Sequence, residues 1–320
     1  MKRMLLVFLG LMAIAPLALG QAKDFPNRAV RVIVPFTSGS GSDTMARFLG
    51  EKLSAILGQP FLVENRPGAN GVIAVTAVKT APADGYTMLL GNISLLAVNP
   101  VTIKDLPYDP LKDLRPIGGL ARGMNAYIVA PNSKLKTLAD LVAAAKNKQQ
   151  PLSAGSYSAG YHLVLEWFAN LASVKFNHIP YKGAAPIFTD VMGNQLDFAI
   201  VDTAGVASLL KSGKLRALAM SGESRHTNFP DVPTVKESGY PEYVYYSWVS
   251  FWVRAETPDD NTAKLADALQ KALAANDAKE FIKSLGAEVM PYGPAAMQKY
   301  QRDELDRARR TAAIAGIKPE

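Results

Sequence analysis

Two turns rich in serine and glycine stand out, because each follows a short apolar run and opens a helical pattern. The first covers residues 35–43 and the second residues 154–160. At a helix start the backbone N–H groups point outward at the positive end of the helix dipole, which suits an anion. A carboxylate gains roughly 1.5 to 3 kcal/mol for each charge-assisted hydrogen bond. The two turns therefore predict opposite sides of one carboxylate-binding site, although each alone could simply cap its helix.

Two aspartates lie at such helix starts and need separate interpretations. Asp43 falls in the first turn of the first helix, where a carboxylate would repel an anionic ligand. Its predicted role is to cap the helix together with Ser40 and to order the turn, and contact with a ligand amino group is the alternative. Asp202 follows a predicted strand, at the end where open α/β sheets bind ligands, and it could equally be a helix cap.

Catalytic and nucleotide-binding motifs are absent from both turns. Neither turn contains the G-x-S-x-G of a nucleophile elbow, and the chain has no cysteine and only three histidines. Gly39-Ser40-Gly41 leads to Thr44 where a dinucleotide fingerprint needs glycine, so nucleotide binding is not indicated. The remaining catalytic alternative is a secreted serine hydrolase, with Ser158 or Ser42 as nucleophile and His162 as base. No metal or cofactor is expected.

The first 22 residues have the character of a signal peptide. A basic start precedes an apolar run of about 15 residues, shorter than the ~20 that cross a bilayer, and small residues follow it. The mature chain is therefore expected outside the cytoplasm. The formal net charge is +7, but the basic residues are scattered rather than clustered, so nucleic acid is not an expected partner.

The rest of the 320 residues predicts α/β domains with mainly parallel sheets, because short apolar runs alternate with helical patterns. The length suits two domains. Strands are expected at residues 30–34, 86–90, 126–130, 196–201, 215–220 and 250–253, and helices at 45–56, 163–171, 261–276, 295–315 and after a capping box at 137–140. Proline-containing segments at 107–110, 131–133 and 239–243 are the expected crossings between domains.

Seven short segments with distinctive sequences are spread in order over the mature chain: Val34-Pro35-Phe36 with Gly39 and Asp43, then residues 64–69, 83–87, 106–110, 180–186, 213–219 and 230–234. They resemble the Bug (Bordetella uptake gene) family, also called the TctC family, of extracytoplasmic solute receptors in tripartite tricarboxylate transport. The resemblance implies a type II periplasmic binding protein fold, an α/β architecture of two lobes with mixed, mostly parallel sheets that close on a ligand like a flytrap. It places residues 23–122 and 243–320 in the first lobe and 123–242 in the second.

The resemblance also implies where a ligand binds. Carried over by position, the carboxylate-holding turn falls on residues 37–42, the facing turn on 155–159, and further contacts on 91–94 and Asp202. With the residues singled out above, the candidate ligand-binding set is Phe36, Thr37, Ser38, Gly39, Ser40, Ser42, Asp43, Asn92, Ser94, Gly155, Ser156, Tyr157, Ser158, Ala159, His162 and Asp202.

Three departures from the family pattern bear on the choice of ligand. Ser38-Gly39-Ser40 stands where the family usually has Pro-Gly-Gly, residues 91–94 replace Gly-Thr-Ser-Gly, and Tyr157 replaces a small residue. Added side chains reshape a pocket, and a tyrosine can stack on an aromatic ring, so an aromatic or bulky carboxylate is favoured over a small one. Tyr157 turned outward, without ligand contact, is the alternative.

The function predicted from these residues is reversible capture of a carboxylate in the periplasm. The ligand class extends from aromatic acids to aliphatic di- and tricarboxylates. A monomeric receptor would deliver it to the permease subunits of a tripartite tricarboxylate transporter, and the alternative partner is a sensor kinase. No enzymatic activity is expected.

Overall fold

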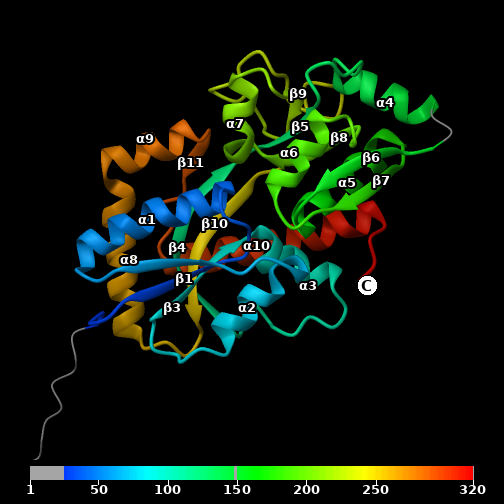
Figure 1. Ribbon diagram of the computed structural model, residues 1–320. Coiled ribbons are helices and arrows are strands. Elements are labelled where there is room, and N and C mark those ends of the chain that lie inside the picture. The colour runs from blue at the N-terminus through cyan, green and yellow to red at the C-terminus, as the bar shows by residue number, and fades with distance from the viewer. Residues whose placement is uncertain (1–24, 148–149, 320) are drawn as a thin grey trace, which may run out of the picture.

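Two β-sheets, each flanked by helices, organise the chain (Figure 1). The computed structural model describes residues 25–147 and 150–319. The six-stranded sheet has the order β11 (Ala287–Val289), β4 (Leu114–Gly123), β10 (Ser247–Arg254), β3 (Thr87–Asn92), β1 (Val30–Val34) and β2 (Phe61–Asn65). The five-stranded sheet has the order β7 (Phe176–Pro180), β6 (Leu152–Ser156), β8 (Phe198–Asp202), β5 (Asn125–Val129) and β9 (Arg216–Met220).

Both sheets are mixed, which confirms the α/β two-lobe class but corrects the expectation of mostly parallel pairing. Among the described residues four strand pairs are parallel and five are antiparallel. The parallel pairs join β1 to β2 and β3, and β6 to β7 and β8. The antiparallel pairs all involve β4, β5 or β10, the strands next to the passages from one sheet to the other.

The six-stranded sheet is covered by helices on both faces, which explains why four of the five residues of β1 are buried valine or isoleucine, with Arg31 as the exception. One face packs against α1 (Gly41–Leu57), α8 (Asp259–Ala274) and α9 (Asn276–Ser284), through residues such as Val32, Leu49 and Leu269. The other packs against α2 (Val72–Lys79), the short turn η2 (Ser94–Val98) and α10 (Pro294–Ala315), through residues such as Ile33 and Met297. The short segments η1 (Ala69–Gly71) and α3 (Asn99–Thr102) lie beside them.

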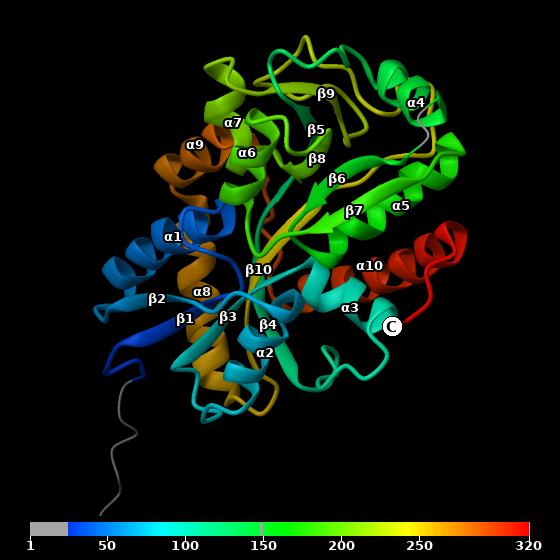
Figure 2. The ribbon, with the colours of Figure 1, turned by 45° about the vertical axis from the view of Figure 1, so that its right-hand side comes forward.

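The five-stranded sheet carries α4 (Leu138–Asn147), α5 (Ala159–Ala172), α6 (Ala184–Met192) and α7 (Thr203–Lys211). The predicted capping box of α4 is confirmed, because Asp140 N–H donates to Thr137 Oγ1 and Thr137 N–H donates to the Asp140 carboxylate. The C-terminal helix α10 runs along α5, so an element that covers the six-stranded sheet also supports the other half of the molecule (Figure 2).

The chain crosses between the sheets twice, and the first crossing contains no proline. Strand β4 leads through Met124 directly into β5, and the return path is the segment 221–246. Buried Ser221 ties these paths together: its hydroxyl accepts from Asn125 N–H at 2.8 Å and donates to Tyr245 C=O at 2.6 Å. Of the three expected crossings only 239–243 lies in such a segment. Residues 107–110 instead precede β4, and 131–133 connect β5 to α4.

Two further expectations, the signal peptide and the bounds of the lobes, stay predictions. The signal peptide at residues 1–22 lies outside the described residues, and the division into lobes of 23–122 plus 243–320 and 123–242 stays a prediction. Within residues 25–147 and 150–319, none of the helices combines the length and the apolar character that a membrane span requires.

Gly91 generates a stability prediction, because β3 passes closely under two buried side chains there. A Cβ at Gly91 would lie 2.5 Å from Trp252 Cδ1 and 2.6 Å from Leu96 Cδ1. We expect Gly91→Ala to lower the free energy of unfolding by about 1 to 3 kcal/mol through overpacking. Urea unfolding measures this, with Gly293→Ala as the control, since a Cβ there meets no atom within 4 Å. Equal stability of the two variants would contradict the packing argument.

Candidate ligand-binding cleft

A cavity between the two sheets lies where three helices begin. We call it the inner chamber, and its empty volume is about 620 Å³, including space open to solvent. The starts of α1, α5 and α7 reach it from different directions, and the β4–β5 junction and the first residues of β10 form its back. It is lined by Phe36, Gly41, Ser42, Met45, Asn92, Ile93, Ser94, residues 121–124, Ser158, Tyr161, Asp202, Ala204, residues 247–249, Gly286 and Ala287.

Two further hollows adjoin the inner chamber. The outer chamber, about 790 Å³ with its solvent-open part, shares Phe36, Asn92, Ser94 and Ser158 with the inner one. It is completed by Pro35, residues 68–71, Leu95, Tyr157 and residues 180–182. The side groove follows the start of α5 past His162 and His178 to the end of α10. The shared residues make the inner and outer chambers neighbouring compartments of one cleft.

The first turn is held in shape by Asp43. Gly39, which has φ of +83°, donates its N–H to Asp43 Oδ2 at 2.9 Å, and Arg47 Nε donates to the same oxygen at 3.1 Å. Ser40 caps α1 by accepting from Asp43 N–H, as predicted. Burial would raise the pKa of Asp43, but hydrogen bonds from Arg47, Gly39 and Asn65 outweigh it and lower the pKa. Asp43 therefore orders the turn instead of facing the cleft.

The two turns meet across the cleft. Ser94 Oγ, beside the first turn, accepts from Gly160 N–H of α5 at 3.0 Å. The rings of Phe36 and Tyr157 pack edge to face with centroids 5.5 Å apart. Thr37 lies so close to Gly183 that a Cβ at Gly183 would collide with the threonine side chain. The chain thus brings the two predicted sides of the site into contact.

Asp202 lies at the centre of this contact. Its side chain caps α7, with Oδ1 accepting from Gly205 N–H at 2.5 Å, and the hydroxyl of Tyr157 donates to Oδ2. The start of α1 approaches from the other side, since a Cβ at Gly41 would lie 2.7 Å from Asp202 Oδ1. Burial raises the pKa of Asp202, and the hydrogen bonds from Tyr157 and Gly205 oppose that rise. The cap interpretation of Asp202 is confirmed, and the residue also lines the inner chamber, while its role as a ligand contact stays a prediction.

Asn92 provides a donor that nothing in the described protein uses. Its Oδ1 accepts from Leu95 N–H at 3.1 Å and so fixes the amide plane. Its Nδ2 is buried and has no hydrogen-bond partner among the described residues, and Asn92 lines both chambers with only 5% of its surface exposed. An unpaired buried amide costs free energy that a ligand acceptor would recover.

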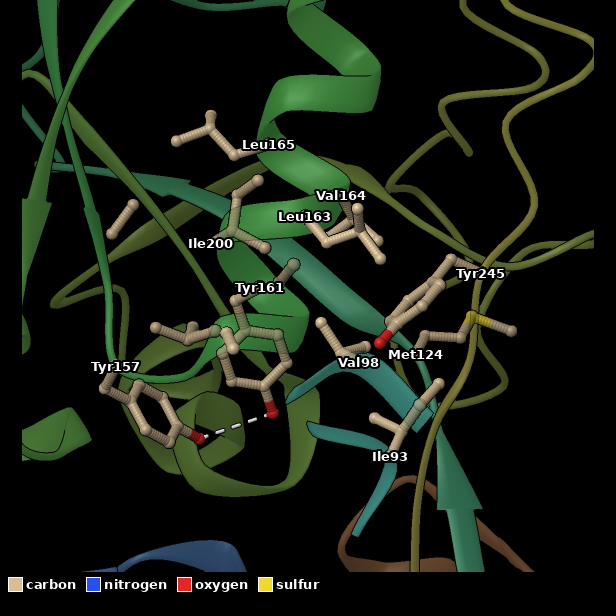
Figure 3. Close-up of a cluster of buried hydrophobic side chains, with 14 of the residues drawn as sticks. Ile93, Val98, Met124, Tyr157, Tyr161, Leu163, Val164, Leu165, Ile200 and Tyr245 are labelled. Carbon is tan, nitrogen blue, oxygen red and sulfur yellow. Dashed lines mark hydrogen bonds between the residues drawn. The ribbon is translucent and has the colours of Figure 1, made fainter. Parts of the chain in front are cut away.

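Tyr157 and Tyr161 form the wall beside Asp202, and Figure 3 shows their hydroxyls turned toward each other. The Tyr157 hydroxyl lies 3.5 Å from that of Tyr161. Tyr157 is only 7% exposed, with its ring enclosed edge-on by Phe36 and Tyr161. Stacking of Tyr157 on a ligand stays a prediction. In this arrangement its hydroxyl is directed to Asp202.

His162 and His178 stack face to face with ring centroids 3.9 Å apart, in the side groove. His162 Nε2 lies 3.5 Å from Glu166 Oε1, and His178 Nε2 lies 2.8 Å from Ser156 Oγ. Ser158 Oγ instead accepts from Tyr161 N–H as the cap of α5. The backbone N–H of His162 donates to Ser158 C=O, but within the described residues no hydrogen bond joins the His162 imidazole to the hydroxyl of Ser158 or Ser42. The catalytic pair of the hydrolase alternative is therefore not assembled.

The candidate residues fall into three groups, and their roles as ligand contacts stay predictions. The two chambers are lined by Phe36, Ser42, Asn92, Ser94, Tyr157, Ser158 and Asp202. The side groove adds Ser156, Ala159 and His162. None of these three cavities is lined by Thr37, Ser38, Gly39, Ser40, Asp43 or Gly155.

Sequence reasoning missed several lining residues. Met45 and Tyr161 lie one turn into their helices, so the helical spacing after each turn was a signal that could have found them. Met124 and Trp248 reach the chamber only through the junction of the sheets. Nothing local in the sequence marks them.

Comparison with known proteins identifies the family. Residues 45–316 match the model described as "Tripartite tricarboxylate transporter family receptor" (TctC). The chain belongs to this family. The receptor is 34% identical over 311 residues to Protein BugT of Bordetella pertussis, a match that covers 96% of this chain and 95% of BugT.

Solved structures give the same assignment. A protein described as Rpa4515 of R. palustris with adipate superposes with a TM-score of 0.90 and 32% identity, covering 93% of this chain and all of that chain. The periplasmic binding protein BugD gives a TM-score of 0.88 and 31% identity, covering 92% of this chain and 100% of BugD. The family is one of transport receptors, which does not favour the hydrolase alternative.

The half-buried His178 should make the stability of this receptor depend on pH. Burial and the neighbouring His162 lower the pKa of His178 from 6.5 to about 4. As the pH falls from 6.5 toward 4, His178 takes up a proton in the unfolded chain but not in the folded one. Proton uptake by the unfolded chain lowers the free energy of unfolding, so the protein keeps its full stability with respect to His178 above pH 6.5 and loses stability below it. We expect urea unfolding at pH 7.5 and pH 5 to show a smaller loss of stability for His178→Asn than for the unmodified protein.

His226→Asn is the comparison for that experiment, because burial also lowers the pKa of His226, which lies against Gly286 away from the stacked pair. Each variant should remove its own share of the pH dependence. An unchanged pH dependence in His178→Asn would show that its imidazole does not contribute.

Proposed function

We propose that this receptor captures a carboxylate-bearing solute in the periplasm and delivers it to the permease subunits of a tripartite tricarboxylate transporter. The observation that carries the proposal is the buried, unpartnered amide of Asn92, which lines both chambers beside the starts of α1 and α5. Helix starts supply N–H groups and a positive potential, and the amide adds a directed donor. The similar protein solved with adipate supports a carboxylate as the ligand class.

Closure of the cleft follows from the same groups. A ligand held by Ser42 and Asn92 on one side and Ser158 on the other would touch both sheets at once. Such a ligand binds the closed arrangement more tightly than an open one and shifts the population toward it. The Ser94–Gly160 hydrogen bond is one cross-cleft contact that would form at closure.

The proposal also covers export, oligomeric state and the moving parts of the receptor. Residues 1–22 act as a cleaved signal peptide, the mature receptor works as a monomer, and the cleft performs binding without covalent chemistry. The lobes that close are residues 23–122 plus 243–320 and residues 123–242. The candidate residues that line the two chambers supply the ligand contacts.

A thermal-shift screen of the mature protein tests the ligand class. The panel contains aliphatic mono-, di- and tricarboxylates, aromatic acids and amino acids, with matched amides and alcohols as controls. A ligand at 100 times its dissociation constant stabilises by about 2.7 kcal/mol, which raises the melting temperature measurably. Shifts by carboxylates and not by their amides are expected, and no shift by any carboxylate would overturn the proposal.

Asn92→Asp tests the donor directly. The substitution keeps the oxygen that accepts from Leu95 N–H and replaces the free Nδ2 with a second oxygen. A lost charge-assisted hydrogen bond of roughly 1.5 to 3 kcal/mol should weaken carboxylate binding about 10- to 100-fold, and charge repulsion adds to this. Isothermal titration with the best ligand of the screen measures the change.

Asn70→Asp serves as the matched control, because Asn70 lines the outer chamber and side groove but not the inner chamber. It introduces the same charge farther from the amide. Equal affinities of the Asn92 and Asn70 variants would remove Asn92 from the site.

A further inference from the structure

The inner chamber differs in character from the helix starts that open into it. Its lining includes Met45, Ile93, Met124, Trp248 and Val249, and the first four of these side chains are at most 8% exposed. Figure 3 shows Ile93 and Met124 grouped beside Tyr245, with Tyr161 facing them from α5. A wall of this composition suits an apolar part of a ligand and offers little to a charged one.

The charged side chains that line the inner chamber are already paired. Asp202 accepts from Gly205 N–H and from the Tyr157 hydroxyl, and it lies against the start of α1. Arg122 is bound by Glu288 at 2.8 Å, and its guanidinium lies 5.2 Å from the ring centroid of Tyr246. Among the described residues, Asp202 and Arg122 are the only charged ones in that lining. A ligand charge that entered the chamber would therefore lose its hydration without gaining a free counter-charge.

The Tyr157 hydroxyl hydrogen-bonds Asp202 and so prevents a ligand donor from using that carboxylate oxygen. Tyr157 lines the outer chamber and Asp202 the inner one, so their hydrogen bond lies at the boundary between the two compartments. The hydroxyl takes the place that a donor group of a ligand could otherwise fill. Nearby Asn92 lines both compartments and leaves its amide free at the same boundary.

On the basis of the proposed function, we propose that the inner chamber is a subsite for the uncharged, apolar body of the ligand. The carboxylate binds at the boundary, near Asn92, and the rest of the molecule lies against Met45, Met124 and Trp248. Tyr157 determines specificity because its hydroxyl donates to Asp202 and so keeps that carboxylate from pairing with a cationic group of a ligand. The receptor accordingly selects a monocarboxylate with an apolar body over compounds of the same length that end in a second carboxylate or an ammonium group.

Two matched series test this selection by isothermal titration at pH 7.5. One consists of hexanoate, adipate and 6-aminohexanoate, and the other of benzoate, terephthalate and 4-(aminomethyl)benzoate. Within each series only the far end of the molecule changes. We expect the uncharged member to bind at least about tenfold more tightly than either charged member, because a buried charge without a partner is penalised.

Tyr157→Phe tests the assigned residue, since it removes the hydroxyl and keeps the ring. With Asp202 free to meet a cation, the affinity of the ammonium compound relative to the uncharged one should rise about tenfold, and the second carboxylate should remain disfavoured. Tyr181→Phe is the matched control. Its hydroxyl donates to Asp190 at 2.5 Å, and the residue lines the outer chamber and side groove but not the inner chamber. The control should leave the order of affinities unchanged.

The outcomes separate this inference from the function on which it rests. Tighter binding of a charged member in either series, binding of di- or tricarboxylates alone, or an unchanged ratio of ammonium to uncharged affinity in Tyr157→Phe would overturn the inference and leave carboxylate capture intact. If no carboxylate in the series or the wider screen binds, carboxylate capture itself is wrong.

Discussion

Partial burial of the Asp202 carboxylate, where the starts of α1 and α7 meet, costs free energy that its neighbours must offset. Gly205 N–H and the Tyr157 hydroxyl each engage one oxygen, and Gly41 brings the positive end of α1 against the same group. These partners come from both sides of the cleft, because Gly41 follows β1 whereas Tyr157 and Gly205 follow β6 and β8. Separating the two sides would remove part of this compensation, so the buried charge couples the two halves of the molecule.

The same constraint explains the glycines of the cleft better than anion binding does. A Cβ at Gly41 would strike Asp202, one at Gly160 would lie 2.8 Å from Ser94 Oγ, and one at Gly183 would collide with Thr37. Each of these glycines permits a close approach between segments of different sheets. Gly39 differs, because its φ of +83° is a backbone requirement of the turn and no atom lies within 4 Å of its would-be Cβ. The glycine content of the turns thus reflects both turn geometry and closure.

Local patterns in the sequence predicted those elements whose residues are buried in a regular way. β1 and β8 are buried almost throughout, so their apolar runs were visible, and the two turns rich in serine and glycine marked the starts of α1 and α5. β4 was missed because its sequence, LRPIGGLARG, contains a proline and two adjacent glycines, and β7 because it is a half-exposed edge strand. The apolar wall of the inner chamber was beyond local reasoning, since Met124 and Trp248 reach it only when the sheets are joined.

The two aspartates of the cleft show how a receptor can bind an anion while carrying carboxylates beside the site. Asp43 is engaged by Gly39 N–H, Arg47 and Asn65, and Asp202 by Gly205 N–H and Tyr157. Each negative charge orders a turn or caps a helix, and the free donor that remains at the cleft is the amide of Asn92, beside the positive ends of the helix dipoles. Because this amide is neutral, it does not add a charge that must be desolvated when the cleft is empty. The chain therefore combines a directed donor at the boundary of the chambers with a deeper wall that has no free charge, and this combination is the physical basis for distinguishing carboxylates by their uncharged end.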